Sequence, residues 1–195
     1  MLAQPGAACR GESQGLPQPV GHLLHAVRVI GCSPGDFSPD GERLVFTRFM
    51  DEAPVGVFVT DLDGSRLVQV SPPDLVLDDT GFGGSWSPDG SQIMFVGRAA
   101  EDQHKEIWIV DADGSSPHRF EMTPACGGGF SDASSAGCYS PEWSPDGSMI
   151  VFTRSSSDGQ TENIYIVNAD GTGLRQVTSG GADDNPDWGT PPADG

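Results

Sequence analysis

Positively charged residues are scarce in this 195-residue sequence. Lysine and arginine together number 10, with Lys105 as the only lysine, whereas aspartate and glutamate number 28, so the formal net charge at pH 7 is −18. Nucleic acids and anionic membrane surfaces are bound through clustered lysine and arginine side chains, so we expect neither as a partner. The acidic balance instead favours cations or basic protein patches.

Long hydrophobic runs are also absent. No stretch of 18 or more apolar residues occurs, so we expect no membrane insertion. Residues 1–22 are polar and rich in glycine, proline and glutamine, and we interpret them as a disordered leader. The apolar run at residues 23–30 is short and Arg28 interrupts it, so no secretory signal peptide is recognised. The compartment therefore stays unknown: the protein is intracellular, or its signal was removed or never included.

The usual signatures of catalysis are missing as well. The sequence has no Gly-x-Ser-x-Gly nucleophile elbow and no Gly-x-x-x-x-Gly-Lys phosphate loop. The four histidines fall in expected strands or loops, and carboxylates are too numerous to single out a catalytic pair. We therefore expect that the protein is not an enzyme and carries no cofactor.

Cysteine is limited to four residues. Cys126 and Cys138 flank a loop rich in glycine and serine, whereas Cys9 and Cys32 lie far from them in the sequence. The simplest interpretation is free thiols in loops. The alternative is a disulfide that closes the 126–138 loop, which requires an oxidising compartment. The spacings do not match a zinc site.

A repeated motif dominates what the sequence does contain. Ser-Pro-Asp-Gly, preceded by an aromatic residue, occurs at residues 38–41, 87–90 and 144–147. A second turn of the type Asp/Asn-x-Asp-Gly follows at residues 61–64, 111–114 and 168–171, so that the two turn glycines are 23, 24 and 24 residues apart. A period this regular marks a repeated supersecondary unit.

Each unit is expected to hold four antiparallel strands. Proline, aspartate and glycine in the first turn suit a tight turn whose glycine adopts positive φ. Alternating or β-branched runs follow both turns, and aromatic residues recur in register at Phe46, Phe95 and Phe152. Such aromatic stripes are usually the core between stacked sheets. A separate strand is expected at residues 23–31, and residues 71–82 and 121–140 are expected to be long loops.

These residues carry a family resemblance. The pattern of Trp/Phe-Ser-Pro-Asp-Gly, an Ile/Leu-x-Phe strand and Ile-Tyr/Trp-Ile-Val-x-Ala-Asp-Gly resembles the TolB-type, WD-like β-propeller repeat, also found in propellers attached to prolyl-oligopeptidase-type hydrolases, and covers about residues 33–189. The resemblance implies an all-β fold of β-propeller blades: three four-stranded antiparallel sheets plus an extra inner strand, as a partial or half propeller. It also implies a periplasmic or secreted location.

The expected organisation follows from the repeat boundaries. Residues 1–22 form the leader, 23–71 a strand plus blade 1, 72–123 blade 2, 124–180 blade 3, and 181–195 the start of a fourth blade and a tail. Three blades do not close a ring, because propellers typically have four to eight. Either two copies associate as a homodimer that completes a six-bladed ring, or the chain is a fragment of a longer propeller or a marginal monomer.

Strand parity places the loops at two ends of the sheets. Both turn motifs share one end, and the longer loops gather at the other, where binding residues usually lie. We expect an acidic loop face there that binds a protein or peptide, although solvated carboxylates without a ligand are the simpler interpretation. The candidate residues are Asp51, Glu52, Asp78, Asp79, Glu101, Asp102, Asp158, Glu162, Asp183 and Asp184.

The second turn motif offers a weak calcium candidate. Asp61 and Asp63, and likewise Asp111 and Asp113, form the Asp-x-Asp start of a calcium loop, but the further ligands and the bidentate glutamate do not follow. The expected function is a non-catalytic TolB-like propeller module that binds a protein or peptide. The alternatives are an accessory propeller domain of a hydrolase or peptidase system, or a propeller that binds calcium or carbohydrate.

Overall fold

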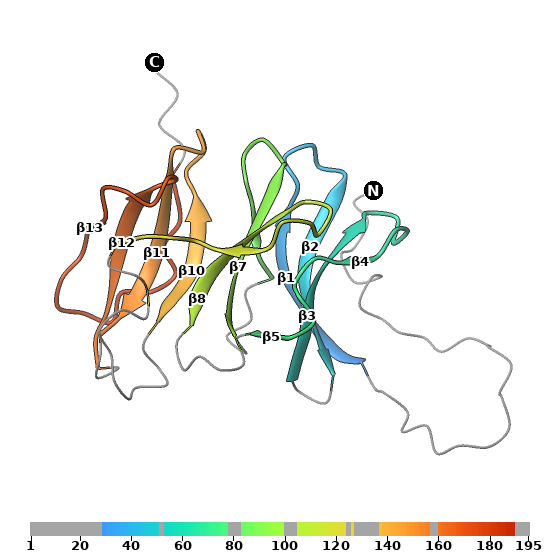
Figure 1. Cartoon of the computed structure of the whole chain (residues 1–195), viewed down its shortest axis with the longest axis horizontal. Helices are drawn as coiled ribbons and strands as arrows, with labels where there is room; N and C mark the ends of the chain where they lie inside the picture. Colours follow the sequence, from blue (N-terminus) through green and yellow to red (C-terminus); the bar gives the residue numbers. More distant parts are fainter. Residues whose placement is uncertain are drawn as a thin grey trace, which may run out of the picture.

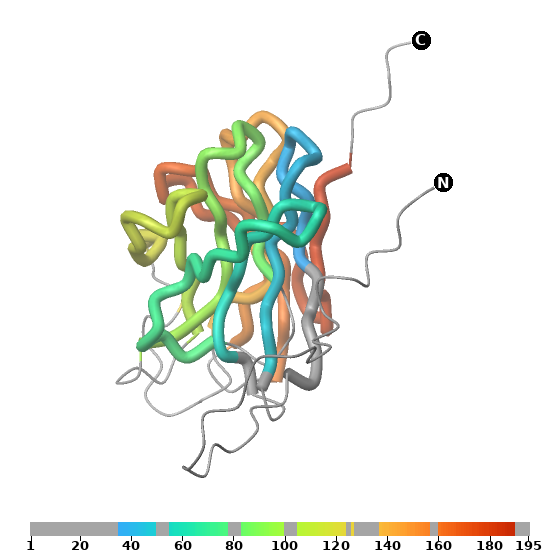
Figure 2. Tube along the Cα trace, turned by 90° about the vertical axis from the view of Figure 1, so that its right-hand side faces the viewer, coloured from blue at the N-terminus to red at the C-terminus, as the bar shows by residue number. Residues whose placement is uncertain are grey.

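The computed structural model describes residues 29–50, 53–77, 83–99, 105–123, 126, 137–156 and 160–189. Three antiparallel sheets stand one after another across the molecule, as Figure 1 shows from blade 1 in blue to blade 3 in red. Viewed from the blade 1 side in Figure 2, the sheets lie behind one another. No helix among the described residues is long and apolar enough to span a membrane. The all-β fold of stacked, partial-propeller sheets is therefore confirmed.

Each sheet is built from consecutive strands. Blade 1 contains β1 (Val29–Phe37), β2 (Arg43–Met50), β3 (Ala53–Asp61) and β4 (Val68–Gln69). Blade 2 contains β5 (Leu75–Leu77), β6 (Ser85–Trp86), β7 (Gln92–Ala99), β8 (Glu106–Asp111) and β9 (His118–Arg119). Blade 3 contains β10 (Cys138–Trp143), β11 (Met149–Ser155), β12 (Glu162–Asn168) and β13 (Arg175–Gln176).

Two expectations about the inner strands need correction. The separate strand expected at residues 23–31 and the first strand of blade 1 are one element, because β1 runs from Val29 to Phe37 and pairs with β2. The region expected as a loop at residues 71–82 contains β5, which pairs with β7 alongside β6. The inner strand of blade 2 is thus made of two pieces. Residues 1–28, including the expected leader, lie outside the described residues.

The Ser-Pro-Asp-Gly turns have the expected chemistry. In the first copy, the Gly41 amide donates to the Ser38 carbonyl at 2.8 Å, and the Ser38 amide donates to the Arg43 carbonyl at 2.9 Å. The carboxylate of Asp40 accepts from the Glu42 amide at 3.0 Å. Gly41 has a φ of 71°, which a residue with a Cβ adopts only with strain. The same bonds recur in the other two copies, so the turn fixes the hairpin register.

The two turn motifs of each blade lie at the same end of the sheet. Backbone amides in the second turn donate to the carbonyl of the residue directly after the first turn of the same blade. The three bonds are Leu62 to Glu42 at 3.1 Å, Ala112 to Ser91 at 2.8 Å and Ala169 to Ser148 at 2.9 Å. The prediction that both turn motifs share one end of the sheet is therefore confirmed, whereas the gathering of the longer loops at the other end stays a prediction.

Two apolar clusters hold the blades together. Val45, Val57 and Val59 of blade 1 pack with Ile93 and other residues of blade 2, and a second cluster joins blade 2 to blade 3 around Met94, Ile107 and Phe152. Each fully buried side chain of this size contributes about 1.5–3 kcal/mol.

The repeated aromatics lie on the leading face of each blade, the face toward the preceding blade. Trp86 packs in the blade 1–blade 2 cluster with 5% exposure, whereas its counterpart Phe37 in blade 1 is 56% exposed. Phe152 stacks with Tyr165 at 6.0 Å between ring centroids, and Phe46 stacks with Phe58 at the same distance. The leading face of blade 1 thus carries an exposed aromatic side chain of the repeat, Phe37.

Cys126 and Cys138 form a disulfide bond, with 5.4 Å between their Cα atoms. The expectation of free thiols is therefore wrong for this pair. Cys138 begins β10 and is fully buried, and Cys126 is 4% exposed within the blade 2–blade 3 cluster. The bond ties the long connection between these two blades to the first strand of blade 3.

Residues 181–189 stand where the extra strand was expected. They are not a regular strand: Ala182 makes one parallel bridge with Glu162. The Trp188 indole Nε1 donates to the Glu142 carbonyl at 3.2 Å, which anchors the far end of this segment on the inner strand of blade 3.

Candidate functional site

The loop end of blade 3 is where predicted site residues come together. Of the ten acidic candidates, Glu162, Asp183 and Asp184 are described. The other seven lie outside the described residues: Asp51, Glu52, Asp78, Asp79, Glu101, Asp102 and Asp158.

The backbone brings Glu162 and Asp184 together across the end of the sheet. The Glu162 amide donates to the Gly181 carbonyl at 3.2 Å, and the Asp183 amide donates to the Glu162 carbonyl at 3.1 Å. These bonds flank the parallel bridge at Ala182 and place Asp184 just beyond it. The backbone alone forms the pairing between Glu162 and residues 181–183, so this pairing does not depend on the carboxylate side chains.

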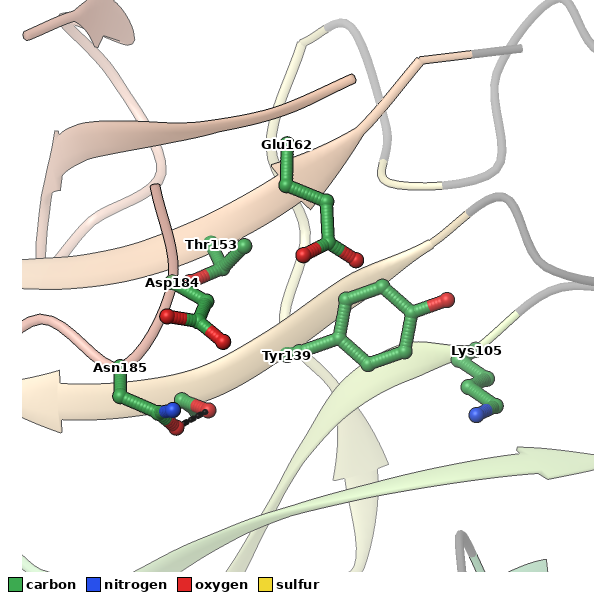
Figure 3. Close-up of a pocket in the computed structure, with 7 residues that line it drawn as sticks. Lys105, Tyr139, Thr153, Glu162, Asp184 and Asn185 are labelled. Atoms are coloured by element: carbon green, nitrogen blue, oxygen red, sulfur yellow. Dashed lines mark hydrogen bonds between the residues drawn. The ribbon is translucent and has the colours of Figure 1, made fainter. Parts of the chain in front are cut away.

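A cavity of about 370 Å³ opens beside this bridge. Glu162 and Asp184 both line it, whereas Asp183 does not. Figure 3 shows their carboxylates directed toward the space beside the Tyr139 ring. Its remaining lining residues are Lys105, Ser140, Thr153 and Asn185. A volume of this size lies at the lower end of the range for small-ligand sites, about 300–1,000 Å³.

Two lining residues hold unusual backbone conformations. Ser140 has a φ of 46° and Asn185 a φ of 50°, the left-handed region that costs energy for residues other than glycine. The Ser140 hydroxyl donates to the Asn185 side-chain oxygen at 3.0 Å, so the two strained residues hold each other. The β10–β11 register shifts between Tyr139 and Glu142, and this irregularity turns Ser140 toward the segment at 185.

Thr153 contributes a polar atom with no partner among the described residues. Thr153 is 1% exposed and lines the cavity, and within this part of the chain its Oγ1 makes no hydrogen bond. Ile150 and Phe152 face blade 2, so Thr153 faces away from it, on the side of residues 181–189. A buried hydroxyl without a partner costs free energy that a ligand on this side would recover.

Lys105 and Tyr139 close the other side of the cavity. The Lys105 Nζ lies 4.9 Å from the centroid of the Tyr139 ring, a cation–π distance. Lys105 reaches this position because its backbone bridges Gly137, just ahead of β10. The described lining residues thus include two carboxylates and one ammonium group, a net charge of −1.

The carboxylates of the calcium candidates accept hydrogen bonds within their own turns. The Asp63 carboxylate accepts from the Ser65 amide at 2.8 Å, and Asp113 accepts from the Ser115 amide at 2.9 Å. The serine hydroxyls, followed by these backbone bonds, hold the pKa of both carboxyls below the usual range. Ser65 and Ser115 also donate to Asp61 and Asp111 at 3.2 Å. No group of three or more metal-ligating side chains occurs among the described residues, and calcium binding stays a prediction.

A second cavity, of about 220 Å³, lies between the inner strands. Asp36, Ser85 and Glu142 line it, and each directly precedes the aromatic residue of its repeat; Asp187 holds the same position before Trp188. The Ser85 hydroxyl donates to the Glu142 carboxylate at 2.7 Å. Burial, followed by the charges of Asp36 and Asp187, raises the pKa of Glu142 to about 7. We call this set of four the inner-strand cluster.

Sequence reasoning found two of the seven residues that line the 370 Å³ cavity. Thr153 was missed because its strand pattern matches that of packed positions elsewhere. Tyr139 was missed because residues 121–140 were expected to be a loop, whereas Tyr139 lies in β10. Asn185 lies in a segment recognised only as a restarting repeat. For the inner-strand cluster a signal was present, since its four members share one repeat position.

No family model matches the chain. The Tol-Pal system protein TolB of Anaeromyxobacter dehalogenans is 32% identical over 103 residues, which is 53% of this chain and 22% of that protein. TolB of Anaeromyxobacter sp. strain K is 31% identical over 130 residues, 66% of this chain and 25% of that protein. The chain thus spans about a quarter of the length of these curated relatives.

Solved structures give the same fold. A TolB candidate from Agrobacterium tumefaciens matches with a TM-score of 0.59 and 22% identity, over 76% of this chain and 50% of that one. TolB from Acinetobacter baumannii matches with a TM-score of 0.55 and 20% identity, over 77% and 32%.

Proposed function

The chain carries TolB-type β-propeller repeats, and from that premise we propose that it is a non-catalytic module that binds a protein or peptide partner through the acidic loop end of blade 3. The observation that supports the proposal is the cavity in which Glu162 and Asp184 meet. Carboxylates beside an open cavity, in a chain with a net charge of −18, favour a positively charged partner surface.

The proposal assigns no catalytic step to this chain. A prolyl endopeptidase structure shares the fold with a TM-score of 0.50 and 14% identity, over 76% of this chain and 22% of that one. An accessory role beside a hydrolase is therefore the second candidate. It requires a catalytic domain elsewhere in the same protein or complex, and co-purification of such a domain would favour it.

The disulfide bears on location. Disulfides persist in oxidising compartments and are rare where thiols are kept reduced. The buried Cys126–Cys138 bond therefore supports a periplasmic or secreted protein.

The binding test uses a fluorescein-labelled peptide of alternating lysine and glycine, followed by fluorescence anisotropy. We expect the dissociation constant to rise steeply as salt is raised from about 0.05 to 0.5 M, because the Debye length shortens over this range. Glu162→Gln should weaken binding at low salt. Glu42→Gln removes the same charge at the turn end and should leave binding unchanged. Binding that is insensitive to salt, or equally weakened by both variants, would contradict the proposal.

Ring closure is a finer part of the proposal. We propose that a second copy covers the exposed leading face of blade 1, where Phe37 is 56% exposed. Size-exclusion chromatography with light scattering separates a 20.4 kDa monomer from a dimer of twice that mass. A dimer that Phe37→Ser converts to monomer would support closure by this face, whereas a wild-type monomer at high concentration would refute it.

A further inference from the structure

The loop-end cavity of blade 3 is rich in hydrogen-bond acceptors that converge from three segments. β11 provides the Thr153 hydroxyl, β12 provides the Glu162 carboxylate, and the segment after Ala182 provides Asp184. We propose that this cavity receives one guanidinium group, from an arginine side chain of a partner polypeptide. The inference rests on the proposed function and names the ligand chemistry of the same site.

The unpartnered hydroxyl points to a ligand that reaches deep into the cavity. Thr153 Oγ1 has no hydrogen-bond partner and the side chain is 1% exposed, so the cost of its burial is not offset within the described residues. A group that only lies across the mouth of the cavity would meet the carboxylates but not this hydroxyl. A long side chain with a polar tip would meet both.

The donor pattern favours guanidinium over other cations. A guanidinium group presents five N–H donors in one plane and no acceptor, which suits two carboxylates and a hydroxyl arranged around one space. An ammonium group has three donors and is more strongly hydrated, so it loses more hydration free energy on entering the cavity. A divalent metal ion is not favoured, because no group of three metal-ligating side chains occurs in the described part of the chain.

Charge gives an independent reason for a single cation. Glu162 and Asp184 contribute two negative charges, and Lys105 contributes one positive charge from its position over the Tyr139 ring. One further positive charge brings the site to neutrality, whereas two would leave an excess buried beside Lys105. The cavity of about 370 Å³ also has room for one arginine side chain.

The site is held in shape before any ligand arrives. The backbone bonds around Ala182 hold the main chain at Glu162 and just ahead of Asp184, and the Ser140–Asn185 hydrogen bond holds the neighbouring wall at two strained residues. A ligand that enters a formed site does not have to order it, and this raises affinity for a given set of contacts.

The experiment follows amide chemical shifts of the isotope-labelled chain during titration with three small probes. Acetyl-Gly-Arg-Gly-amide carries the guanidinium, acetyl-Gly-citrulline-Gly-amide replaces it with a neutral group of the same shape, and agmatine carries it without a peptide. We expect the arginine peptide to shift signals near Tyr139, Thr153, Glu162 and Asp184. We expect the citrulline peptide to bind at least about ten-fold more weakly, since it lacks the charge.

Variants test which side-chain atoms bind the ligand. Glu162→Gln should weaken the arginine peptide about 10–100-fold, because it removes a charge-assisted hydrogen bond. Thr153→Val keeps the side-chain shape, removes the hydroxyl, and should weaken binding about 3–10-fold. Glu42→Gln is the matched control at the turn end and should leave the affinity unchanged. If Thr153→Val does not fold, Glu162→Gln carries the test alone.

Several outcomes would overturn the inference. Equal affinity for the arginine and citrulline peptides would show that the positive charge does not contribute to binding. Shifts confined to other parts of the chain would place the ligand elsewhere, and tighter binding of agmatine than of the peptide would indicate a free guanidino compound instead of a polypeptide. Failure of the lysine–glycine peptide with success of the arginine peptide would refute the broad electrostatic surface while leaving this site intact.

Discussion

Replacing Thr153 with valine should make the protein more stable. Buried polar groups are almost always hydrogen-bonded, and Thr153 Oγ1 is an exception within a side chain that is 1% exposed. Valine has the same shape with a methyl group in place of the hydroxyl, so it removes the unpaired group without opening a cavity. A buried hydroxyl left without a partner costs about 1–3 kcal/mol.

The repeat supplies a matched control for this substitution. Thr47 occupies the same position in blade 1, directly after Phe46 as Thr153 follows Phe152, and is 2% exposed. Thr47 does make a polar interaction, unlike the Thr153 hydroxyl. Thr47→Val should therefore lower the free energy of unfolding by about 1 kcal/mol, although both variants make the same chemical change at equally buried sites.

The assay is thermal unfolding followed by circular dichroism, with urea unfolding as a second measurement. For a chain of this size, 1 kcal/mol corresponds to a shift of about 2–4 °C in Tm. We expect Thr153→Val to raise Tm by at least this amount and Thr47→Val to lower it by a similar amount. If both variants lose the same stability, the Thr153 hydroxyl has a partner such as a bound water molecule, and the reasoning that makes it a ligand contact fails.

Two further predictions concern the inner-strand cluster and the disulfide. The pKa of Glu142 is raised to about 7 in the folded state from an ordinary value of 4.5, so the folded protein holds the extra proton and its stability should fall as pH rises from 4.5 through 7. Because Glu142 is partly solvated, we expect the free energy of unfolding to fall by about 1–2 kcal/mol over this range. Urea unfolding of Glu142→Gln at several pH values should show no such fall. If the variant keeps the pH dependence of the wild type, Glu142 is not its cause. Replacing Cys126 and Cys138 with serine removes a cross-link between residues 12 positions apart and should lower the free energy of unfolding by about 3 kcal/mol. A reductant should lower the Tm of the wild type by more than it lowers the Tm of the double variant.

The fold was predictable because local chemistry and the repeat period agree. Ser-Pro-Asp-Gly specifies a turn through the fixed φ of proline, the carboxylate of aspartate and the positive φ of glycine, and three copies at a regular distance leave few alternatives to repeated antiparallel sheets. The repeat period did not predict β5, because Leu75–Leu77 is short and no turn motif marks its position. It also gave no basis for pairing Cys126 with Cys138, since a disulfide depends on the path of an irregular connection.

The site was only partly predictable because a strand pattern records which residues face inward but not what lies opposite. Glu162 and Asp184 were found because loop carboxylates are visible in the sequence. Thr153 was not, because an alternating strand with an inward threonine is compatible with ordinary packing. Tyr139 was not, because it was expected in a loop and lies instead at the start of β10. Their proximity to Asn185 arises from a contact across about 45 residues, which has no local signature.

Thr47 and Thr153 show why one repeat position has different roles in different blades. Thr47 lies on the same face as Val45, which packs against blade 2, and its hydroxyl is not among the unsatisfied buried groups. Thr153 instead faces residues 181–189, which contribute one bridge to Glu162 and no ladder. That segment is bonded to blade 3 at its bridge, at Asn185 and at Trp188, and a cavity lined by acceptors lies beside the bridge and Asn185. The binding position is therefore created by the irregularity of the neighbouring segment, and a variant that extends the ladder there should close the cavity and abolish binding.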